Sequence, residues 1–186
     1  MSNDVFFHRT MEILLHQYSQ TKPQLHIIAN YFGFKIITGT FHNNETAYVD
    51  GESETIIING NDTFIRQRWA TAFAIITLLE MKCGVIPREN IYHYAKDYNV
   101  DNNVEKNIYV SRLLIPAATI ERSMRVFKTI ESFSDYYQVS KTAALYRLER
   151  FFNHSNPRKN GNDDTFLKDV SSDVLGFAKN MLSLFM

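Results

Sequence analysis

One stretch of this sequence, residues 68–79, predicts a helix that is apolar on nearly every side. A surface helix needs a polar face toward water, so a helix of this kind is stable only inside a protein core. The stretch follows the polar residues Asn61 and Asp62, which are typical of the turn before a helix. We therefore expect a fold built around this buried central helix, whose apolar side chains are Trp69, Ala72, Phe73, Ile75, Ile76, Leu78 and Leu79.

The residues before the central helix predict two helices and three short strands. One helix is expected over about residues 4–18 with Asp4 as its cap, and a second after the Lys22-Pro23 break, stopping at Gly33. We expect the three strands to form a small antiparallel sheet, so the predicted class is α+β with a helical C-terminal half. The strands are predicted at residues 34–38, 46–49 and 55–58, with turn-rich segments between them.

Length and composition indicate one principal domain. The chain has 186 residues, of which 45% are hydrophobic, enough for one sizeable core. Its single cysteine, Cys83, excludes an intramolecular disulfide and any zinc-ribbon spacing. No run approaches the roughly 18 apolar residues that a membrane helix requires, and the N-terminus lacks the pattern of a signal peptide. We expect a soluble, cytoplasmic protein with no membrane partner.

The central helix also resembles the metal-binding helix of a zinc peptidase, but it lacks the metal ligands and the catalytic glutamate. In an H-E-x-x-H helix, two imidazoles one turn apart bind one zinc ion, and the glutamate deprotonates the metal-bound water. The corresponding positions here would hold Phe73, Ala74 and Thr77. A phenyl ring and a methyl group offer no lone pair, and a threonine hydroxyl is a poor zinc ligand. These three residues would be the remnants of a catalytic motif.

Two later segments carry a family resemblance. Residues 105–116, E-K-N-I-Y-V-S-R-L-L-I-P, are similar to the E-A-N-x-F-A-x-x-L-L-M-P segment of the ImmA/IrrE family of zinc metallopeptidases. Residues 136–148 resemble that family's F-x-V-S-x-x-A-x-x-x-R-L. The resemblance covers about residues 23–152 and implies a zincin-like metallopeptidase fold for residues 1–152.

The same resemblance implies that Glu105 stands where the family has its carboxylate zinc ligand. One carboxylate cannot hold a catalytic zinc ion, which needs three protein ligands and an open position. We therefore expect no bound metal, no cofactor and no peptidase activity. A replacement site built from His93 and Glu105 is conceivable, but it would be short of ligands, and a lone histidine among tyrosines is more often a hydrogen-bonded residue.

Residues 132–152 have the pattern of a helix-turn-helix hairpin. Val139 and Ser140 predict the turn, and Lys141, Arg147 and Arg150 are expected on or near the exposed side of the second helix. Such side chains could contact a partner protein or hold DNA phosphates. Residues 105–160 carry only a modest basic excess, which favours packing of the hairpin against the core over DNA reading.

The sequence changes character after the hairpin. Residues 153–164 are polar and predict a flexible linker. Apolar residues recur at helical spacing in residues 165–186 and predict an amphipathic helix whose apolar face must be covered by other protein surface. That cover could be the chain's own domain, a partner, or a second copy in a homodimer.

These expectations lead to a regulatory function rather than an enzymatic one. Members of the resembled family are typically encoded on mobile elements such as phages or act as stress regulators, and active ones cleave a DNA-binding repressor. A member that keeps the scaffold without the motif is expected to act by binding, for example as an antirepressor that sequesters a transcriptional regulator. The alternatives are a DNA-binding regulator that uses residues 132–152 and a metallopeptidase with a non-standard metal site.

Overall fold

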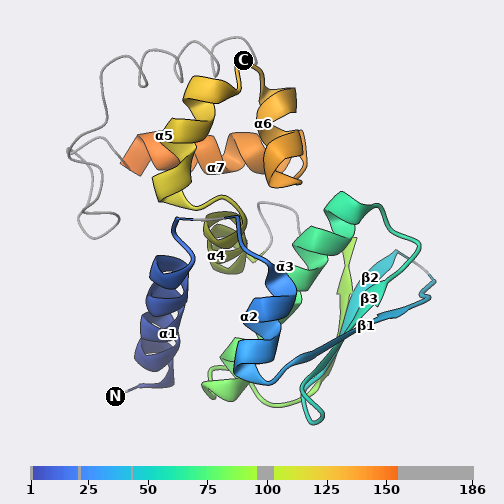
Figure 1. Ribbon diagram of the computed structural model, residues 1–186. Coiled ribbons are helices and arrows are strands. Elements are labelled where there is room, and N and C mark those ends of the chain that lie inside the picture. The colour runs from blue at the N-terminus through green and yellow to red at the C-terminus, as the bar shows by residue number, and fades with distance from the viewer. Residues whose placement is uncertain (1, 21, 43, 96–102, 155–186) are drawn as a thin grey trace.

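The computed structural model describes residues 2–20, 22–42, 44–95 and 103–154 (Figure 1). The predicted amphipathic helix at 165–186 and most of the predicted linker at 153–164 lie outside these residues. In chain order, the elements are α1 (Asn3–Gln17), α2 (Leu25–Phe32), β1 (Lys35–Gly39), β2 (Glu45–Asp50), β3 (Thr55–Asn59), α3 (Phe64–Lys82), β4 (Asn90–Tyr94), α4 (Val104–Leu114), α5 (Ala117–Val126), α6 (Ile130–Tyr137) and α7 (Lys141–His154).

The predicted α+β class is confirmed, but the prediction of an antiparallel sheet is wrong. The four strands are ordered β1-β3-β2-β4, with β1 parallel to β3 and the other two pairings antiparallel. β1 and β2 are not neighbours in the sheet, because β3 lies between them and pairs with both. The sequence analysis also missed the edge strand β4, whose five residues give too short an alternating pattern to stand out.

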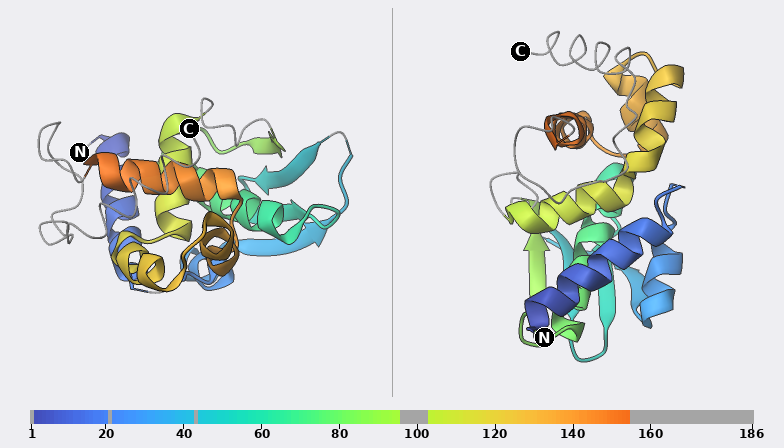
Figure 2. Two further views of the ribbon diagram at one scale, coloured as in Figure 1. Left: turned by 90° about the horizontal axis from the view of Figure 1, so that it is seen from above. Right: turned by 90° about the vertical axis from the view of Figure 1, so that its left-hand side faces the viewer.

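The prediction of a buried central helix is confirmed. α3 begins at its N-cap Thr63, whose side chain accepts a hydrogen bond from the Arg66 backbone N–H. It packs against β2 and β3 and also contacts α2 and α4, so elements lie around it on several sides (Figure 2). Every residue from Ala72 to Leu79 is buried. A helix that meets neighbours in so many directions has no need of a polar face.

The helices before the sheet follow the sequence closely. α1 begins one residue earlier than expected, and its cap is Ser2 rather than Asp4, because the Ser2 hydroxyl accepts a hydrogen bond from the Val5 backbone N–H. α2 ends where predicted. Gly33 has a φ of 81°, a left-handed conformation that glycine adopts without the cost of a Cβ clash.

The helical C-terminal half packs α4 and α7 beside each other, and α6 and α7 form the predicted hairpin (Figure 1). α6 starts at a Thr129 capping box and ends at Gln138, which has a left-handed backbone. α7 continues to His154, so the expected start of a linker at residue 153 is two residues too early. Within the described part of the chain, no helix is both long and apolar enough to cross a membrane.

Candidate functional site

Phe73, Ala74 and Thr77, which the sequence analysis compared with a zinc-peptidase motif, lie together on α3 and are buried. Phe73 is 1% exposed, while Ala74 and Thr77 are each 0% exposed. The Thr77 hydroxyl donates a hydrogen bond to the backbone carbonyl of Phe73 over 3.1 Å. The Phe73 ring meets the imidazole of His93 edge to face, at 5.0 Å between ring centroids. The space beside these positions is therefore packed with protein atoms.

A lysine from α4 reaches this packed region. Lys106 Nζ donates a hydrogen bond to Thr77 Oγ1 over 3.0 Å and lies 2.6 Å from a carboxylate oxygen of Glu80. The same ammonium lies 4.9 Å from the centroid of the Phe73 ring, within the range of a cation–π contact. The side chains of Lys106 and Glu80 are each only 14% exposed. We call Phe73, Thr77, Glu80, His93 and Lys106 the Lys106 cluster.

The ionisable groups of the cluster respond to their burial. Burial raises the pKa of the Glu80 carboxyl, and the neighbouring Lys106 charge opposes that rise. Burial also lowers the pKa of His93 to about 3, with the Lys106 charge adding to the effect. His93 is thus a neutral imidazole at neutral pH, with Nε2 3.4 Å from Thr77 Oγ1. The cluster pairs one buried cation with one carboxylate.

Glu105, the proposed vestigial zinc ligand, lies elsewhere. Its side chain is 68% exposed, and its carboxylate is 3.5 Å from Nε2 of His8 on α1. Successive residues of a helix point about 100° apart, so Glu105 and Lys106 leave α4 in different directions. The structure places Lys106 against Thr77 and leaves Glu105 exposed beside His8. It therefore does not support the His93/Glu105 metal site that was considered from the sequence.

The sequence analysis missed Lys106, although a signal for it was present. Lys106 precedes the buried residues Val110 and Leu113 at helical spacing, which places it on the inward stripe of α4. A lysine on such a stripe needs a buried partner, and Glu80 on α3 provides it. Among the described residues, no group of three or more His, Cys, Asp or Glu side chains could hold a metal ion.

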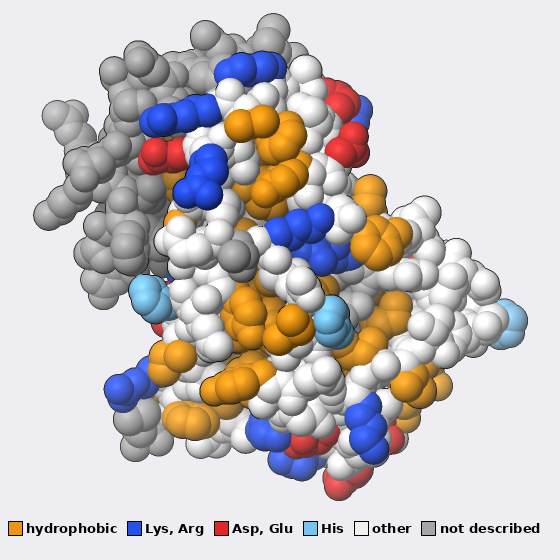
Figure 3. Space-filling model, viewed as in Figure 1, with side chains coloured by type: hydrophobic (Ala, Val, Ile, Leu, Met, Phe, Trp, Pro, Cys, Tyr) orange, Lys and Arg blue, Asp and Glu red, His pale blue; other side chains and the backbone are white. Residues whose placement is uncertain are grey.

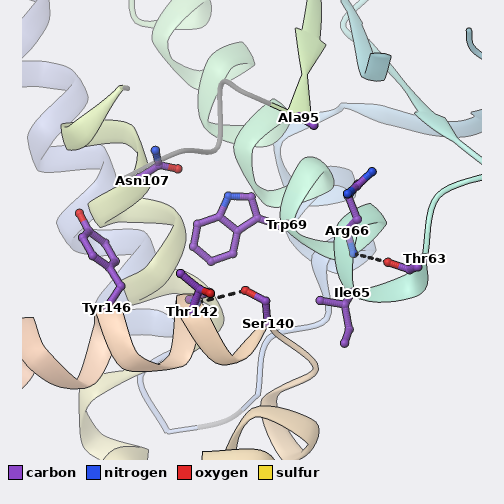
Figure 4. Close-up of a pocket in the computed structure, with 10 residues that line it drawn as sticks. Thr63, Ile65, Arg66, Trp69, Ala95, Asn107, Ser140, Thr142 and Tyr146 are labelled. Carbon is purple, nitrogen blue, oxygen red and sulfur yellow. Dashed lines mark hydrogen bonds between the residues drawn. The ribbon is translucent and has the colours of Figure 1, made fainter. Parts of the chain in front are cut away.

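A cleft opens one turn before the cluster on the same side of α3. Trp69 is four residues before Phe73, and its ring lies between α3 and the start of α7 (Figure 4). The cleft has a volume of about 340 Å³ and is lined from α3, α4, α7 and the end of β4. We call it the Trp69 cleft; its lining residues are Thr63, Ile65, Arg66, Trp69, Ala95, Asn107, Ser140, Thr142, Ala143 and Tyr146.

Two polar groups of the Trp69 cleft have no hydrogen-bond partner among the residues that the structure describes. Trp69 Nε1 and the Tyr146 hydroxyl are both buried without one. A buried polar group without a partner costs about 1–3 kcal/mol, so such groups favour a ligand that supplies the missing bond. The guanidinium of Arg150 lies 4.7 Å from the centroid of the Tyr146 ring, within the range of a cation–π contact.

The three basic residues proposed as contacts have different environments. Lys141 is exposed and pairs with Glu131 at 2.6 Å. Arg150 packs on Tyr146, as described above. Arg147 contradicts the prediction that it lies on the open side of α7, because it is 5% exposed and its Nε donates to the backbone carbonyl of Ile115 over 3.1 Å.

Arg147 is buried for a structural reason. α4 ends at Ile115, where backbone carbonyls have no partner within the helix, and a buried arginine from a packed neighbour can satisfy one of them. The aliphatic part of the side chain fills core volume while its head makes the hydrogen bond. A helical pattern alone does not reveal this role, and only two of the three proposed contacts remain accessible.

No model of a known protein family matches this sequence, and no curated protein matches it.

Proposed function

We propose that this chain is a peptidase-like regulatory protein that has no hydrolytic centre and acts by binding a partner protein. The observation that carries the proposal is the Lys106 cluster. The ammonium of Lys106 contacts Thr77 at a position where the resemblance implies a zinc ligand. A zinc ion there would lie beside a buried positive charge, and electrostatic repulsion in a poorly screened site is strong.

The remaining chemistry of the cluster also argues against hydrolysis. A peptidase must bind its metal through several lone pairs and leave one position open to water. Phe73 and Ala74 offer no lone pair, and the Thr77 hydroxyl already interacts with Lys106. Neutral His93 is a possible donor, but it is a single one. Phe73, Ala74 and Thr77 are each 1% exposed or less, which argues against access of a peptide substrate to these positions.

We place the binding function in the Trp69 cleft. Its volume of about 340 Å³ is enough for one or two side chains of a partner segment. Trp69 and Tyr146 offer aromatic surface together with polar groups that need partners, a combination that is common where proteins bind one another. A segment that inserts an apolar side chain and presents a carbonyl to Trp69 Nε1 would fit this chemistry.

The resemblance supplies the identity of the proposed partner. We propose a transcriptional regulator of a mobile element, bound in the cytoplasm and sequestered rather than cleaved. The chain would then be an antirepressor that keeps the recognition scaffold of a peptidase and has lost its reaction.

The test is co-purification with the regulator encoded beside this chain. We expect a complex at micromolar concentration and an intact regulator after prolonged incubation. Thr142→Phe should abolish the complex, because this exposed α7 residue lines the cleft and a phenyl ring would fill it. Tyr31→Ala is the matched control, since Tyr31 is an aromatic residue 68% exposed on α2, outside the cleft. Cleavage of the regulator, or full binding by Thr142→Phe, would refute the proposal.

A further inference from the structure

A second cavity lies on another side of α3, away from the Trp69 cleft. It has a volume of about 530 Å³ and is formed by the start of α2, the strands β1 and β3, the first turns of α3, and Gln138 at the end of α6. Phe64, Arg68 and Thr71 reach it at helical spacing, whereas Ile65 and Trp69 face the Trp69 cleft. We call it the Lys22/Arg68 cavity.

Among the described residues that line this cavity, Lys22 and Arg68 carry positive charge and none has a carboxylate. Arg68 Nη2 donates a hydrogen bond to the backbone carbonyl of Pro23 over 3.1 Å, and its Nε is buried with no partner. Neither Lys22 nor Arg68 forms an ion pair with any residue that the structure describes. By contrast, Arg66 on the same helix is paired with Asp62 at 3.2 Å.

The electrostatics of the pair indicate an unfavourable local excess of positive charge. Burial lowers the pKa of Lys22, and the nearby charge of Arg68 lowers it further. Burial also lowers the pKa of Arg68. Both effects mean that the charged forms are less favourable here than in water. A bound anion would offset both effects, and shifted groups that converge on one cavity are typical of binding sites.

Two surrounding features fit an anion with an apolar body. α2 begins at the cavity, and its N-cap Gln24 makes no side-chain capping hydrogen bond, so the positive end of the helix adds to the field. Ile36 and Phe64 supply apolar wall, and Phe64 is 60% exposed. In Figure 3, basic side chains gather near the start of α2 with hydrophobic ones beside them, while the acidic ones lie farther away.

We propose that the Lys22/Arg68 cavity binds a small organic phosphate, with the dianionic head between the two basic side chains and the body against Ile36 and Phe64. A phosphate monoester carries about two negative charges at neutral pH, which matches the two cations. The guanidinium fork suits phosphate oxygens, and an ammonium suits them as a point charge. The cavity volume lies within the usual range for small-molecule sites. This site is independent of partner binding in the Trp69 cleft.

Calorimetric titration of the full chain tests the proposal, with phenyl phosphate, inorganic phosphate and phenol as probes at one ionic strength. We expect phenyl phosphate to bind more tightly than inorganic phosphate, and phenol not to bind. Lys22→Gln should weaken phenyl phosphate binding by about tenfold, the effect of one lost charge-assisted hydrogen bond. Lys35→Gln is the matched control, because it removes the same charge from an exposed residue of β1 that does not line the cavity, and should change binding less than about twofold.

Several results would overturn the proposal. One is the absence of phenyl phosphate binding at millimolar concentration, and another is binding of phenyl phosphate by Lys22→Gln with the affinity of the unchanged protein. Equal binding of phenyl phosphate and inorganic phosphate would refute the part played by Ile36 and Phe64. Binding of an acidic peptide without binding of phenyl phosphate would assign the cavity to a protein segment instead. Arg68→Gln repeats the test on the second basic residue. If Arg68→Gln does not fold, the result for Lys22→Gln decides the test.

Discussion

The ammonium of Lys106 lies 3.0 Å from the hydroxyl of Thr77, and the two residues join α4 to the central helix α3. The resemblance implies that Thr77 stands where the peptidase motif has its second imidazole, and a cation of the protein itself lies beside that residue. Glu80, one turn after Thr77 on α3, balances this charge at 2.6 Å.

Loss of the lysine should destabilise the fold. Lys106→Met leaves the Glu80 carboxylate buried without its cation, so we expect the free energy of unfolding to fall by about 3 kcal/mol. Adding Glu80→Gln to Lys106→Met should recover part of this loss, because the unpaired charge is gone. Urea denaturation measures both effects. Lys141→Met removes an exposed lysine with its own acidic partner and serves as the control, with little change in the midpoint. Equal stability of Lys106→Met and the unchanged protein would contradict a structural role for the ion pair.

Stability should fall as the pH is lowered below about 6.5. The pKa of His93 is about 3 in the folded protein and near 6.5 when the chain is unfolded, so only the unfolded state gains a proton between these values. This contribution is fully present above the unfolded pKa, and about 2.7 kcal/mol of it should be lost by about pH 4.5. Denaturation curves for His93→Phe should lack this part of the pH dependence. The exposed-histidine variant His26→Gln should keep it; if His93→Phe keeps it as well, His93 is not buried as a neutral imidazole.

The Trp69 cleft can be followed by fluorescence, because Trp69 is the only tryptophan in the chain. A partner segment that covers the indole should shift its emission to shorter wavelength and protect it from acrylamide quenching. Thr142→Phe should produce similar protection without any partner, since the new ring would fill the same space. Tyr31→Ala should leave the quenching unchanged. A partner that binds without any effect on Trp69 emission must use another surface.

The sequence predicted the elements whose signal is local. The central helix was found because its apolar residues leave no polar face, and the end of α2 was found because Gly33 favours a left-handed conformation. Both features depend on residues close together in the chain. Helix starts were less certain, as the capping of α1 by Ser2 rather than Asp4 illustrates.

Features that depend on distant residues were not predicted. The parallel pairing of β1 with β3 is set by which strands meet across the sheet, and the pattern of a single strand does not contain that information. The roles of Lys106 and Arg147 were missed for the same reason. Each is a long basic side chain whose partner, Glu80 or the Ile115 carbonyl, lies on another helix. Composition suggests exposure for such residues, and only the packed structure shows their burial.

Zinc content is the most direct measure of whether the Lys106 cluster has replaced a metal centre. Protein purified without chelator and dialysed against micromolar zinc should contain far less than one zinc ion per chain by elemental analysis, and His93→Phe should not change that value. One tightly held zinc ion per chain, lost on His93→Phe or on Glu105→Gln, would show that a metal site persists between α3 and α4 and would contradict the proposal of a peptidase-like protein without a hydrolytic centre.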